Sequence, residues 1–419
     1  MSAAFWDERD LSQERCVVTH RHMLELTRLT EIAAAFLKLG LISFGGPVAH
    51  LGYLRTEFVI RRHWLDDEAY ADLVALCQFL PGPASSQTVF GLGLQRAGLP
   101  GALIASICFT LPSALLMIAF AYGVGLIGDL QKAGWLHGLR LAAVAVVAQA
   151  VWGMGKRLCP DLPRFTIAVA AAVLVLFFSN SLGQVGAIAA GTVAGWIIYG
   201  RQEKSSAPTP APTALAKSHF WAALCLISYA GLLIASPAIA ARSAIKGVHL
   251  FDSFYRAGAL VFGGGHVVLP LLRAEVVPPG WISTDAFLAG YGAAQAVPGP
   301  LFTFAAYLGT MIHGSPHAWL GGFGCLLAIF LPAWLLVGGA LPFWHLLLRK
   351  TWAQGAMRGA NAAVVGILLA ALCHPLWQEA VSSVRDVALV VAAFLCLEIW
   401  RKPAWLVVVL AAAAGQWLL

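Results

Sequence analysis

Two cations lie inside apolar stretches, each seven residues before a pair of glycines. Lys38 precedes Gly45, and Arg256 precedes Gly263. Seven residues make about two helical turns, so each cation shares a helix face with its glycine pair, roughly 10 Å along the axis. A lysine in lipid costs about 2.5–3.5 kcal/mol on insertion scales, so a cation kept there points to function. The chemistry that suits a cation beside a helix break is the binding of an anion.

Two further motifs interrupt the apolar segments. Gly45, Gly46 and Pro47 separate a predicted helix over residues 30–45 from the next, and "PGP" ends a predicted helix over residues 67–79. A helix amino terminus presents unpaired N–H groups that favour anions, and broken helices persist at membrane depth only beside protein or a water-filled cavity. We therefore expect the breaks and their flanks to bind substrate. The candidates are Lys38, Gly45, Gly46, Pro47, Gln78, Pro81, Gly82, Pro83, Ser85, Arg256, Gly263, Gly264, Gln295, Pro298, Gly299 and Pro300.

Each of these assignments has a structural alternative. Lys38 and Arg256 are also suited to snorkelling toward a headgroup or to pairing with a carboxylate such as Glu31 or Asp252. The PGP motifs would equally serve as tight turns, which Gln78 and Gln295 would cap. Four further charged residues suit either gating and coupling or a salt-bridged interfacial helix face: Arg55, Glu57, Arg273 and Glu275.

The elements that position these residues are those of a membrane protein. Of 419 residues, 59% are hydrophobic and only 11% are charged, whereas a soluble domain carries about a quarter charged residues. The apolar runs lack the alternation of a transmembrane barrel, so they predict an all-α integral membrane protein. Candidates of about 20 apolar residues give about 10 to 13 membrane segments.

The chain contains an internal duplication. "KLGLISFGGPVAHLGYLRTE" (38–57) aligns without gaps with "RAGALVFGGGHVVLPLLRAE" (256–275), and "QFLPGP" (78–83) meets "QAVPGP" (295–300). The second copy departs from the first at Gly265, which stands where the first copy has Pro47. Residues 201–217, between the two repeats, contain several Pro, Ser and Thr residues, a composition that suits an extended connector. The predicted units are a cytoplasmic segment 1–29, a first repeat 30–200, a cytoplasmic linker 201–217, a connecting transmembrane helix 218–241 and a second repeat 249–419.

The positive charges give the repeats an orientation. Lysines and arginines at 156–164, 201–217, 349–350 and 401–402 mark cytoplasmic junctions under the positive-inside rule. Since one helix crosses between the repeats, the second repeat starts outside. We therefore expect two inverted halves with broken helices, an architecture typical of secondary transporters, with the amino terminus cytoplasmic and the carboxyl terminus outside.

Several function classes are excluded or unsupported by the residues. No P-loop and no dinucleotide-binding fingerprint occurs, so transport would draw on a gradient or the membrane potential. The eight cysteines are scattered and form no C-x-x-C, which predicts neither a metal site nor a disulfide framework. The net charge of +7 gathers at helix ends and does not indicate nucleic-acid binding. We expect no cofactor and no enzymatic activity.

The motifs resemble a known family. Residues 37–112, with F-G-G-P followed by W-L and P-G-P, are similar to the signature domain of the chromate ion transporter family, and 254–332 resemble a second copy. Together they match its long-chain, two-domain members. The resemblance implies export of chromate across a bacterial inner membrane, chromate resistance, a role for the proton-motive force, and competition by sulfate in some members. It also adds Phe44, Arg55 and Trp64 to the motif residues.

The resemblance leaves alternatives open. Uptake or exchange of sulfate or another oxyanion and an anion channel fit the same anion chemistry. A membrane-bound chromate reductase is disfavoured, because the sequence offers no flavin or nicotinamide fingerprint and no cysteine pair. Neither the oligomeric state nor the choice between uniport and proton antiport follows from the sequence.

Overall fold

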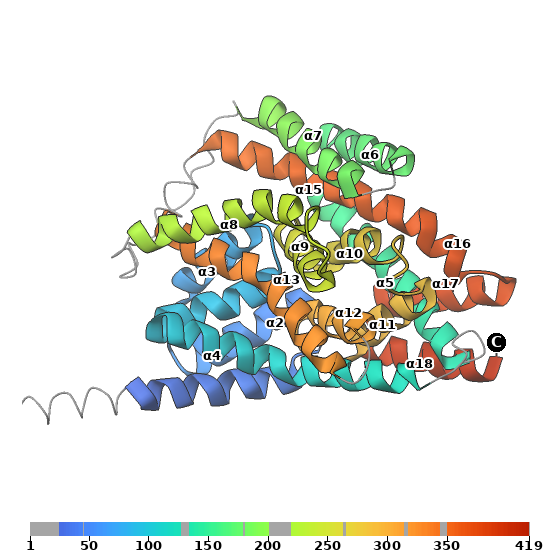
Figure 1. Ribbon diagram of the computed structural model, residues 1–419, viewed down its shortest axis with the longest axis horizontal. Helices are drawn as coiled ribbons and strands as arrows, with labels where there is room; N and C mark the ends of the chain where they lie inside the picture. Colours follow the sequence, from blue (N-terminus) through green and yellow to red (C-terminus); the bar gives the residue numbers. More distant parts are fainter. Residues whose placement is uncertain are drawn as a thin grey trace, which may run out of the picture.

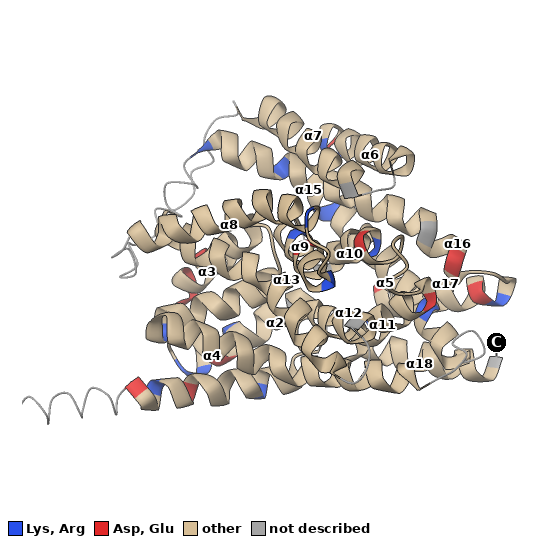
Figure 2. Ribbon diagram, in the orientation of Figure 1, with Lys and Arg blue, Asp and Glu red and all other residues tan. Residues whose placement is uncertain are grey.

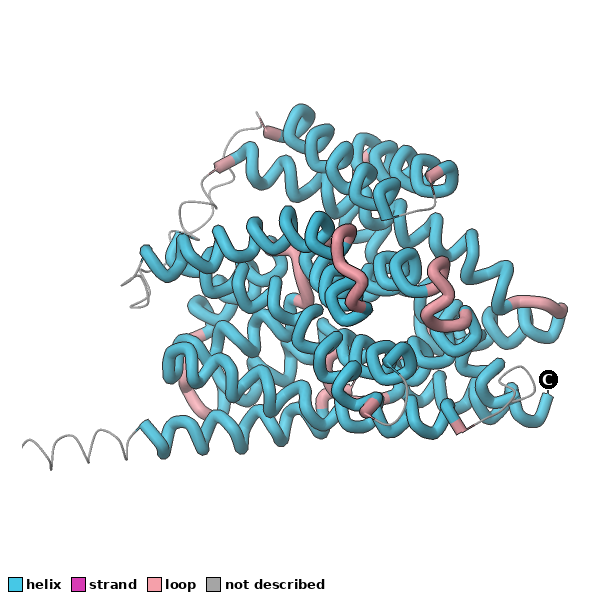
Figure 3. Tube along the Cα trace, viewed as in Figure 1, coloured by secondary structure: helices cyan, strands magenta, loops and turns pink. Residues whose placement is uncertain are grey.

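In the residues that it describes, the computed structural model consists of helices joined by loops and turns (Figure 3). The candidate residues Gly45, Gly263 and Gly264, most of the predicted amino-terminal segment 1–29 and the whole linker 201–217 lie outside the described part. The described ranges are 25–44, 46–126, 134–178, 181–200, 219–262, 265–313, 317–343 and 350–418.

The first half of the chain begins with a helix over residues 25–42, three residues shorter at its carboxyl end than the sequence predicted. The helix predicted over residues 67–79 is confirmed as α3. The elements that follow the first helix are α2 (Gly46–Arg55), the π-helix η1 (Thr56–Arg61), α3 (Asp67–Phe79), α4 (Ala84–Gly125), α5 (Gly134–Leu158), α6 (Leu162–Phe177) and α7 (Ser181–Tyr199).

The second half repeats this order after the connecting helix α8 (His219–Ala240) (Figure 1). Its elements are α9 (Lys246–Ala259), η2 (Gly265–Val267), α10 (Val268–Val276), α11 (Thr284–Ala296), η3 (Leu301–Thr303), α12 (Phe304–His313), α13 (Ala318–Ala340), η4 (Leu341–Phe343), α15 (Thr351–Ala371), η5 (Leu372–Leu376), α16 (Trp377–Ala380), α17 (Val384–Glu398) and α18 (Ala404–Leu418).

Short polar residues set the helix starts. Asp66 accepts a hydrogen bond from the Ala69 N–H at the start of α3, and Ser283 caps the equivalent helix α11 in the same way. These side chains satisfy backbone donors that have no partner within the helix. α4 bends at Ala97 and Gly98, where Gly98 has a φ of 64° that favours glycine.

The composition of the helices matches a membrane protein. Within the described residues, six helices are long and apolar enough to cross a membrane, and three shorter apolar helices accompany them. Figure 2 shows most of the ribbon without charge, with charged residues gathered at helix ends and around α9 and α10. The all-α membrane fold expected from the sequence is confirmed.

The two halves exchange their last hairpins. α6 and α7 of the first half pack against α15 of the second, while α17 and α18 pack against α5 of the first. Glycines permit these contacts, because a Cβ atom on Gly359 would lie 2.0 Å from the Gly191 carbonyl oxygen, and one on Gly138 would lie 2.1 Å from the Ala411 carbonyl oxygen. Close approach through small residues is typical of membrane helix pairs. The halves therefore form one interlocked body.

This exchange makes a prediction about assembly. Gly359→Val is expected to separate α15 from α7, because the added atoms meet backbone that cannot give way, at a cost of about 1–3 kcal/mol or more. Size-exclusion chromatography of detergent-solubilised protein should show loss of the monodisperse peak. Gly153→Val is the matched control, since a Cβ atom at Gly153 meets nothing within 4 Å. An equally large monodisperse peak for both variants would contradict the packing described above.

Candidate functional site

Each PGP motif is hydrogen-bonded to the helix break of the other repeat. The Gly82 N–H donates to the Val261 carbonyl oxygen over 2.6 Å, and the Gly299 N–H donates to the Ser43 carbonyl oxygen over 2.8 Å. Gly82 aligns with Gly299 and Ser43 with Val261 in the sequence repeat, so these two bonds are equivalent. We call the two places crossings: the first joins Ser43 to Gly299, and the second joins Val261 to Gly82.

Both crossings require glycine. Gly82 has a φ of 127° and Gly299 a φ of 99°, which side chains rarely adopt. A Cβ atom on Gly82 would lie 2.6 Å from the Gln87 side-chain nitrogen, and one on Gly299 would lie 2.7 Å from the Ser113 hydroxyl oxygen. The absence of a side chain leaves room for Ser113 of the other repeat at Gly299 and for Gln87 of the same repeat at Gly82.

The crossings also occupy backbone N–H groups that the sequence analysis predicted to bind substrate. The N–H groups of Gly82 and Gly299 are occupied by the opposite repeat. What remains at these breaks is the first turn of α2, which begins at Gly46 with Pro47 next, and the first turn of α4, which begins after Pro83 and carries Ser85. First-turn N–H groups have no partner inside their own helix.

Polar side chains beside the crossings have spare hydrogen-bonding capacity. At the first crossing the Ser43 hydroxyl and His50 Nδ1 have no hydrogen-bond partner among the described residues, while His50 Nε2 lies 3.0 Å from the Ser43 carbonyl oxygen. At the second crossing the Ser86 hydroxyl and Gln87 Oε1 also have no hydrogen-bond partner among the described residues. The Gln87 side-chain amide donates to the Pro81 carbonyl oxygen. These four residues were missed as candidates, although each lies beside a quoted motif.

Arg256 is paired with two carboxylates. Its guanidinium lies 2.9 Å from Asp252 Oδ2 and 2.8 Å from Glu275 Oε2. Only 7% of the Asp252 side chain and 12% of the Glu275 side chain are exposed. The Ser253 hydroxyl also donates to Glu275, and the Ser236 hydroxyl to Asp252. Of the alternatives for Arg256, the structure shows carboxylate pairing, and the partner includes the predicted Asp252.

Lys38 makes the equivalent contact more loosely. Its ammonium lies 3.4 Å from Glu57 Oε2, and Glu57 aligns with Glu275. Half of the Lys38 side chain is exposed, and Arg62 also donates to Glu57 over 2.9 Å. The cation and carboxylate at equivalent positions therefore pair in both repeats, but the second-repeat pair is the more buried. Glu31, the partner considered from sequence, instead binds Arg62 and Arg96.

The remaining candidates lie in different surroundings. Arg55 pairs with Asp67 on an exposed surface, and Arg273 pairs with Glu379. Gln78 is exposed, whereas Gln295 is half-buried with its side-chain nitrogen unpartnered among the described residues. Phe44 contacts the ring of Trp405 on α18, and Pro298 and Pro300 are buried beside Gly299.

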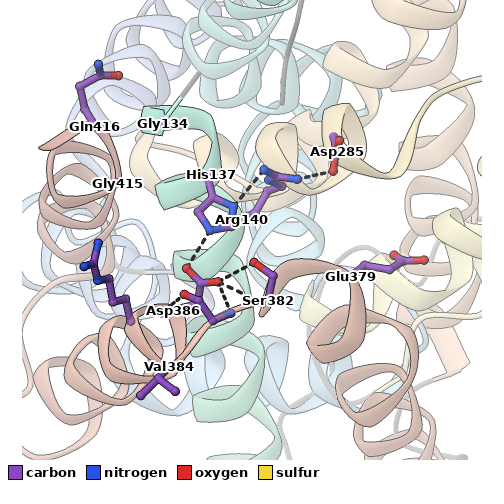
Figure 4. Close-up of a pocket in the computed structure, with 12 residues that line it drawn as sticks. Gly134, His137, Arg140, Asp285, Glu379, Ser382, Val384, Asp386, Gly415 and Gln416 are labelled. Atoms are coloured by element: carbon purple, nitrogen blue, oxygen red, sulfur yellow. Dashed lines mark hydrogen bonds and ion pairs between the residues drawn. The ribbon is translucent and has the colours of Figure 1, made fainter. Parts of the chain in front are cut away.

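A polar pocket of about 1110 Å³ lies away from these breaks (Figure 4). His137 and Arg140 of α5 face Asp285 of α11 and Asp386 of α17 there, joined by hydrogen bonds. Sequence reasoning missed this cluster. The available signal was a histidine and an arginine three residues apart inside the apolar segment 131–155.

Comparison with known proteins gives the family. A sequence profile described as chromate transporter matches residues 30–196 and again 248–416. The chromate transport protein of Pseudomonas aeruginosa is 28% identical over 402 residues, covering 93% of this chain and 92% of that protein. The chromate transport protein of Cupriavidus metallidurans is 26% identical over 366 residues, covering 84% and 83%. A probable chromate transport protein of Synechococcus elongatus is 27% identical over 363 residues, covering 84% and 85%.

No solved structure matches the chain. The family profile nevertheless covers both repeats, and each match contains one helix break and one PGP motif. The chain belongs to the chromate transporter family.

Proposed function

We propose that this protein is a secondary active transporter that exports chromate from the cytoplasm. The observation that carries the proposal is the pair of equivalent crossings inside two repeats of the chromate transporter family. Relatives named chromate transport proteins extend over most of the chain, which favours chromate above other oxyanions. In this role the protein confers chromate resistance, and it acts without a cofactor.

The chemistry of chromate fits the breaks. Chromate is a tetrahedral dianion that accepts hydrogen bonds, so first-turn N–H groups, hydroxyls and a cation complement it. We propose Lys38 and Arg256 as its charged ligands, with the dianion displacing Glu57 or Glu275. The break residues Phe44, Gly46, Pro47 and Ser85 form the rest of the site, and the two PGP motifs, whose glycine N–H groups bind the opposite repeat, hold these breaks in place. Arg55 and Arg273 then act in gating or coupling.

The membrane potential supplies a driving force. With about 2.3 kcal/mol per charge, an inside-negative potential of 100 mV moves a dianion outward with about 4.6 kcal/mol. Export is therefore favourable as uniport, and exchange for protons adds to it. We propose that the protein lies in the bacterial inner membrane, where this potential favours the movement of chromate out of the cytoplasm.

The polar pocket supports the inverted topology. The charge-based path puts the start of α5, the end of α15–α16, the start of α17 and the end of α18 outside. The pocket is lined by residues from these four ends, including Gly134, Glu379, Ser383 and Gln416. We therefore propose repeats at 30–200 and 249–419 with the connecting helix 218–241 crossing once, a cytoplasmic amino terminus and a periplasmic carboxyl terminus.

Purified protein in liposomes tests substrate and site together. Chromate flux is expected to saturate, and unlabelled chromate should compete more strongly than sulfate. Lys38→Ala and Arg256→Gln should each lower the flux per folded molecule, whereas Glu25→Gln, at an exposed position on the same first helix as Lys38, should not. Stronger competition by sulfate would favour the alternative of a sulfate carrier. A flux that rises linearly with concentration would favour a channel, and unchanged flux in both cation variants would refute the site.

A further inference from the structure

A small pocket with a basic lining lies between the first helix and α4 of the first repeat. Its volume of about 160 Å³ holds about five water molecules at about 30 Å³ each, which is room enough for one phosphate group. The lining comes from the start of the first helix, the loop between η1 and α3, and the part of α4 before its bend: Arg28, Trp64, Leu65, Leu92, Gln95 and Arg96. We call this site the basic pocket.

The ion pairs around the basic pocket contain more cations than carboxylates. Glu31 and Glu57 are each bound by more than one positively charged side chain. The cations that share these two carboxylates are Lys38, Arg61, Arg62 and Arg96. Arg28 adds a fifth cation, which makes no ion pair with any residue in the described part of the chain. The pocket therefore borders an excess of positive charge that the two carboxylates do not neutralise.

Arg96 has hydrogen-bond donors left for a ligand. Its Nη2 donates to Glu31 over 2.9 Å, and its guanidinium carbon lies 4.9 Å from the centre of the Trp64 ring. Its Nε is buried without a hydrogen-bond partner among the described residues. A guanidinium has five N–H donors in one plane and binds phosphate with two of them at once. The indole ring holds this plane in position, and the Gln95 amide adds a further donor to the lining.

The second repeat closes the equivalent corner with its own backbone. Lys246 stands where the first repeat has Arg28, and its ammonium donates to the Ile312 carbonyl oxygen over 2.9 Å. Ile312 aligns with Gln95 of the pocket lining. The cation that is unpaired in the first repeat is therefore bonded within the protein in the second.

The arginines of this corner also occur in the first copy alone. His313 stands where the first copy has Arg96, and residues 276–281 contain no counterpart of Arg61 or Arg62. In the proposed inverted topology, the first-repeat corner faces the cytoplasm and the second-repeat corner faces outside. Basic pockets between membrane helices on the cytoplasmic side suit the headgroups of anionic lipids. The arginines are thus found in the copy that would face the anionic leaflet.

Apolar surface adjoins the basic pocket. Leu65 and Leu92 belong to its lining. Beyond the bend of α4, the exposed side chains of Leu99, Leu103 and Ile107 follow at intervals of four residues, so they share one helix face. Leu99 and Leu103 also line an apolar groove of about 620 Å³ between α4, α8 and α13. A phosphate that is joined to apolar chains suits this border better than a free anion does.

We propose that the basic pocket binds the phosphate group of an anionic phospholipid. Arg28 and Arg96 pair with the phosphate, Gln95 donates a hydrogen bond to it, and the acyl chains lie along the apolar face of α4 that begins at Leu99. The bound lipid links the first helix to α4 at the membrane surface. This site is additional to the proposed transport function and does not depend on it, and the proposed topology assigns it to the cytoplasmic leaflet.

Lipid binding to the purified full-length protein tests the site directly. Native mass spectrometry in a neutral detergent gives the Kd of the first bound lipid. The probes are dioleoyl phosphatidylglycerol and dioleoyl phosphatidylcholine, which have the same acyl chains. Phosphatidylglycerol is expected to bind about tenfold more tightly, because no choline cation offsets the charge of its phosphate. Equal Kd values for the two lipids would overturn the proposal.

Substitutions locate the binding in the basic pocket. Arg28→Gln and Arg96→Gln are each expected to raise the Kd for phosphatidylglycerol about fivefold, the effect of one cation beside an anionic headgroup. Arg28→Gln should leave folding intact, because Arg28 makes no ion pair with a described residue, whereas Arg96 also binds Glu31. Arg157→Gln, at the exposed end of α5, removes one positive charge on the same proposed side and should leave the Kd unchanged. An unchanged Kd in Arg28→Gln would overturn the proposal.

Inorganic phosphate and chromate distinguish the lipid from a soluble anion. Neither anion in large excess is expected to displace phosphatidylglycerol from the protein. Binding of phosphate or chromate that is lost in Arg28→Gln, with no binding of phosphatidylglycerol, would overturn the lipid proposal in favour of a soluble anion. None of these measurements involves flux, so a failure of chromate transport would refute the proposed function and leave the lipid site standing.

Discussion

Gly299→Ala is expected to lower chromate flux by about tenfold or more. The added methyl group meets the Ser113 hydroxyl oxygen at 2.7 Å, and the residue must keep a φ of 99°. Such strain costs about 1–3 kcal/mol, and each 1.4 kcal/mol is a factor of ten. The hydrogen bond to Ser43 in the other repeat is weakened as well. Flux in vesicles, divided by the amount of folded protein, measures the effect.

A substitution at the second crossing gives a second test, and a substitution at a glycine in α2 gives the control. Gly82→Ala should act in the same direction, because its φ of 127° and the contact with Gln87 impose the same requirement. Gly52→Ala in α2 should retain normal flux, since a Cβ atom there meets nothing within 4 Å. If Gly299→Ala transported as well as Gly52→Ala, the crossings would have no part in transport.

Arg256→Ala is expected to destabilise the protein far more than Lys38→Ala. Removing Arg256 leaves Asp252 and Glu275 buried without their cation, at a cost of about 3–5 kcal/mol. Lys38 is half exposed, and Glu57 retains Arg62, so this loss is about 0–1 kcal/mol. Thermal unfolding of solubilised protein should show the difference in Tm.

A compensating change distinguishes stability from transport. Arg256→Ala combined with Glu275→Gln is expected to recover part of the lost Tm, because one of the uncompensated charges is removed. Chromate flux should remain low in this double variant, since the proposed cationic ligand is still absent. Recovery of both Tm and flux would show that Arg256 serves structure alone.

The sequence predicted local structure well because the signals are local. The duplication, the end of α3 at the first PGP motif and the start of α2 with Pro47 in its first turn follow from glycine, proline and hydropathy. The equivalence of Lys38 with Arg256 also follows from alignment, and the structure gives them equivalent carboxylate partners.

Contacts between residues far apart in the chain could not be predicted from these local sequence signals. Nothing within "ISFGGPVAH" says that the Ser43 carbonyl oxygen accepts from Gly299 in the other repeat. The exchange of hairpins depends on how helices pack across the whole chain, and the Arg140–Asp285 contact joins residues from opposite repeats. The tight fit at Gly82 and Gly299 is therefore a property of the assembled repeats.

Inside-out vesicles with an imposed potential test the central claim of chromate export most directly. In these vesicles the cytoplasmic face is outward, so export appears as chromate uptake. With the interior made positive, we predict saturable uptake that depends on the protein and is reduced in Gly299→Ala. A pH gradient with an acidic interior should increase it. Absence of uptake under either gradient, with flux only in right-side-out vesicles, would contradict export.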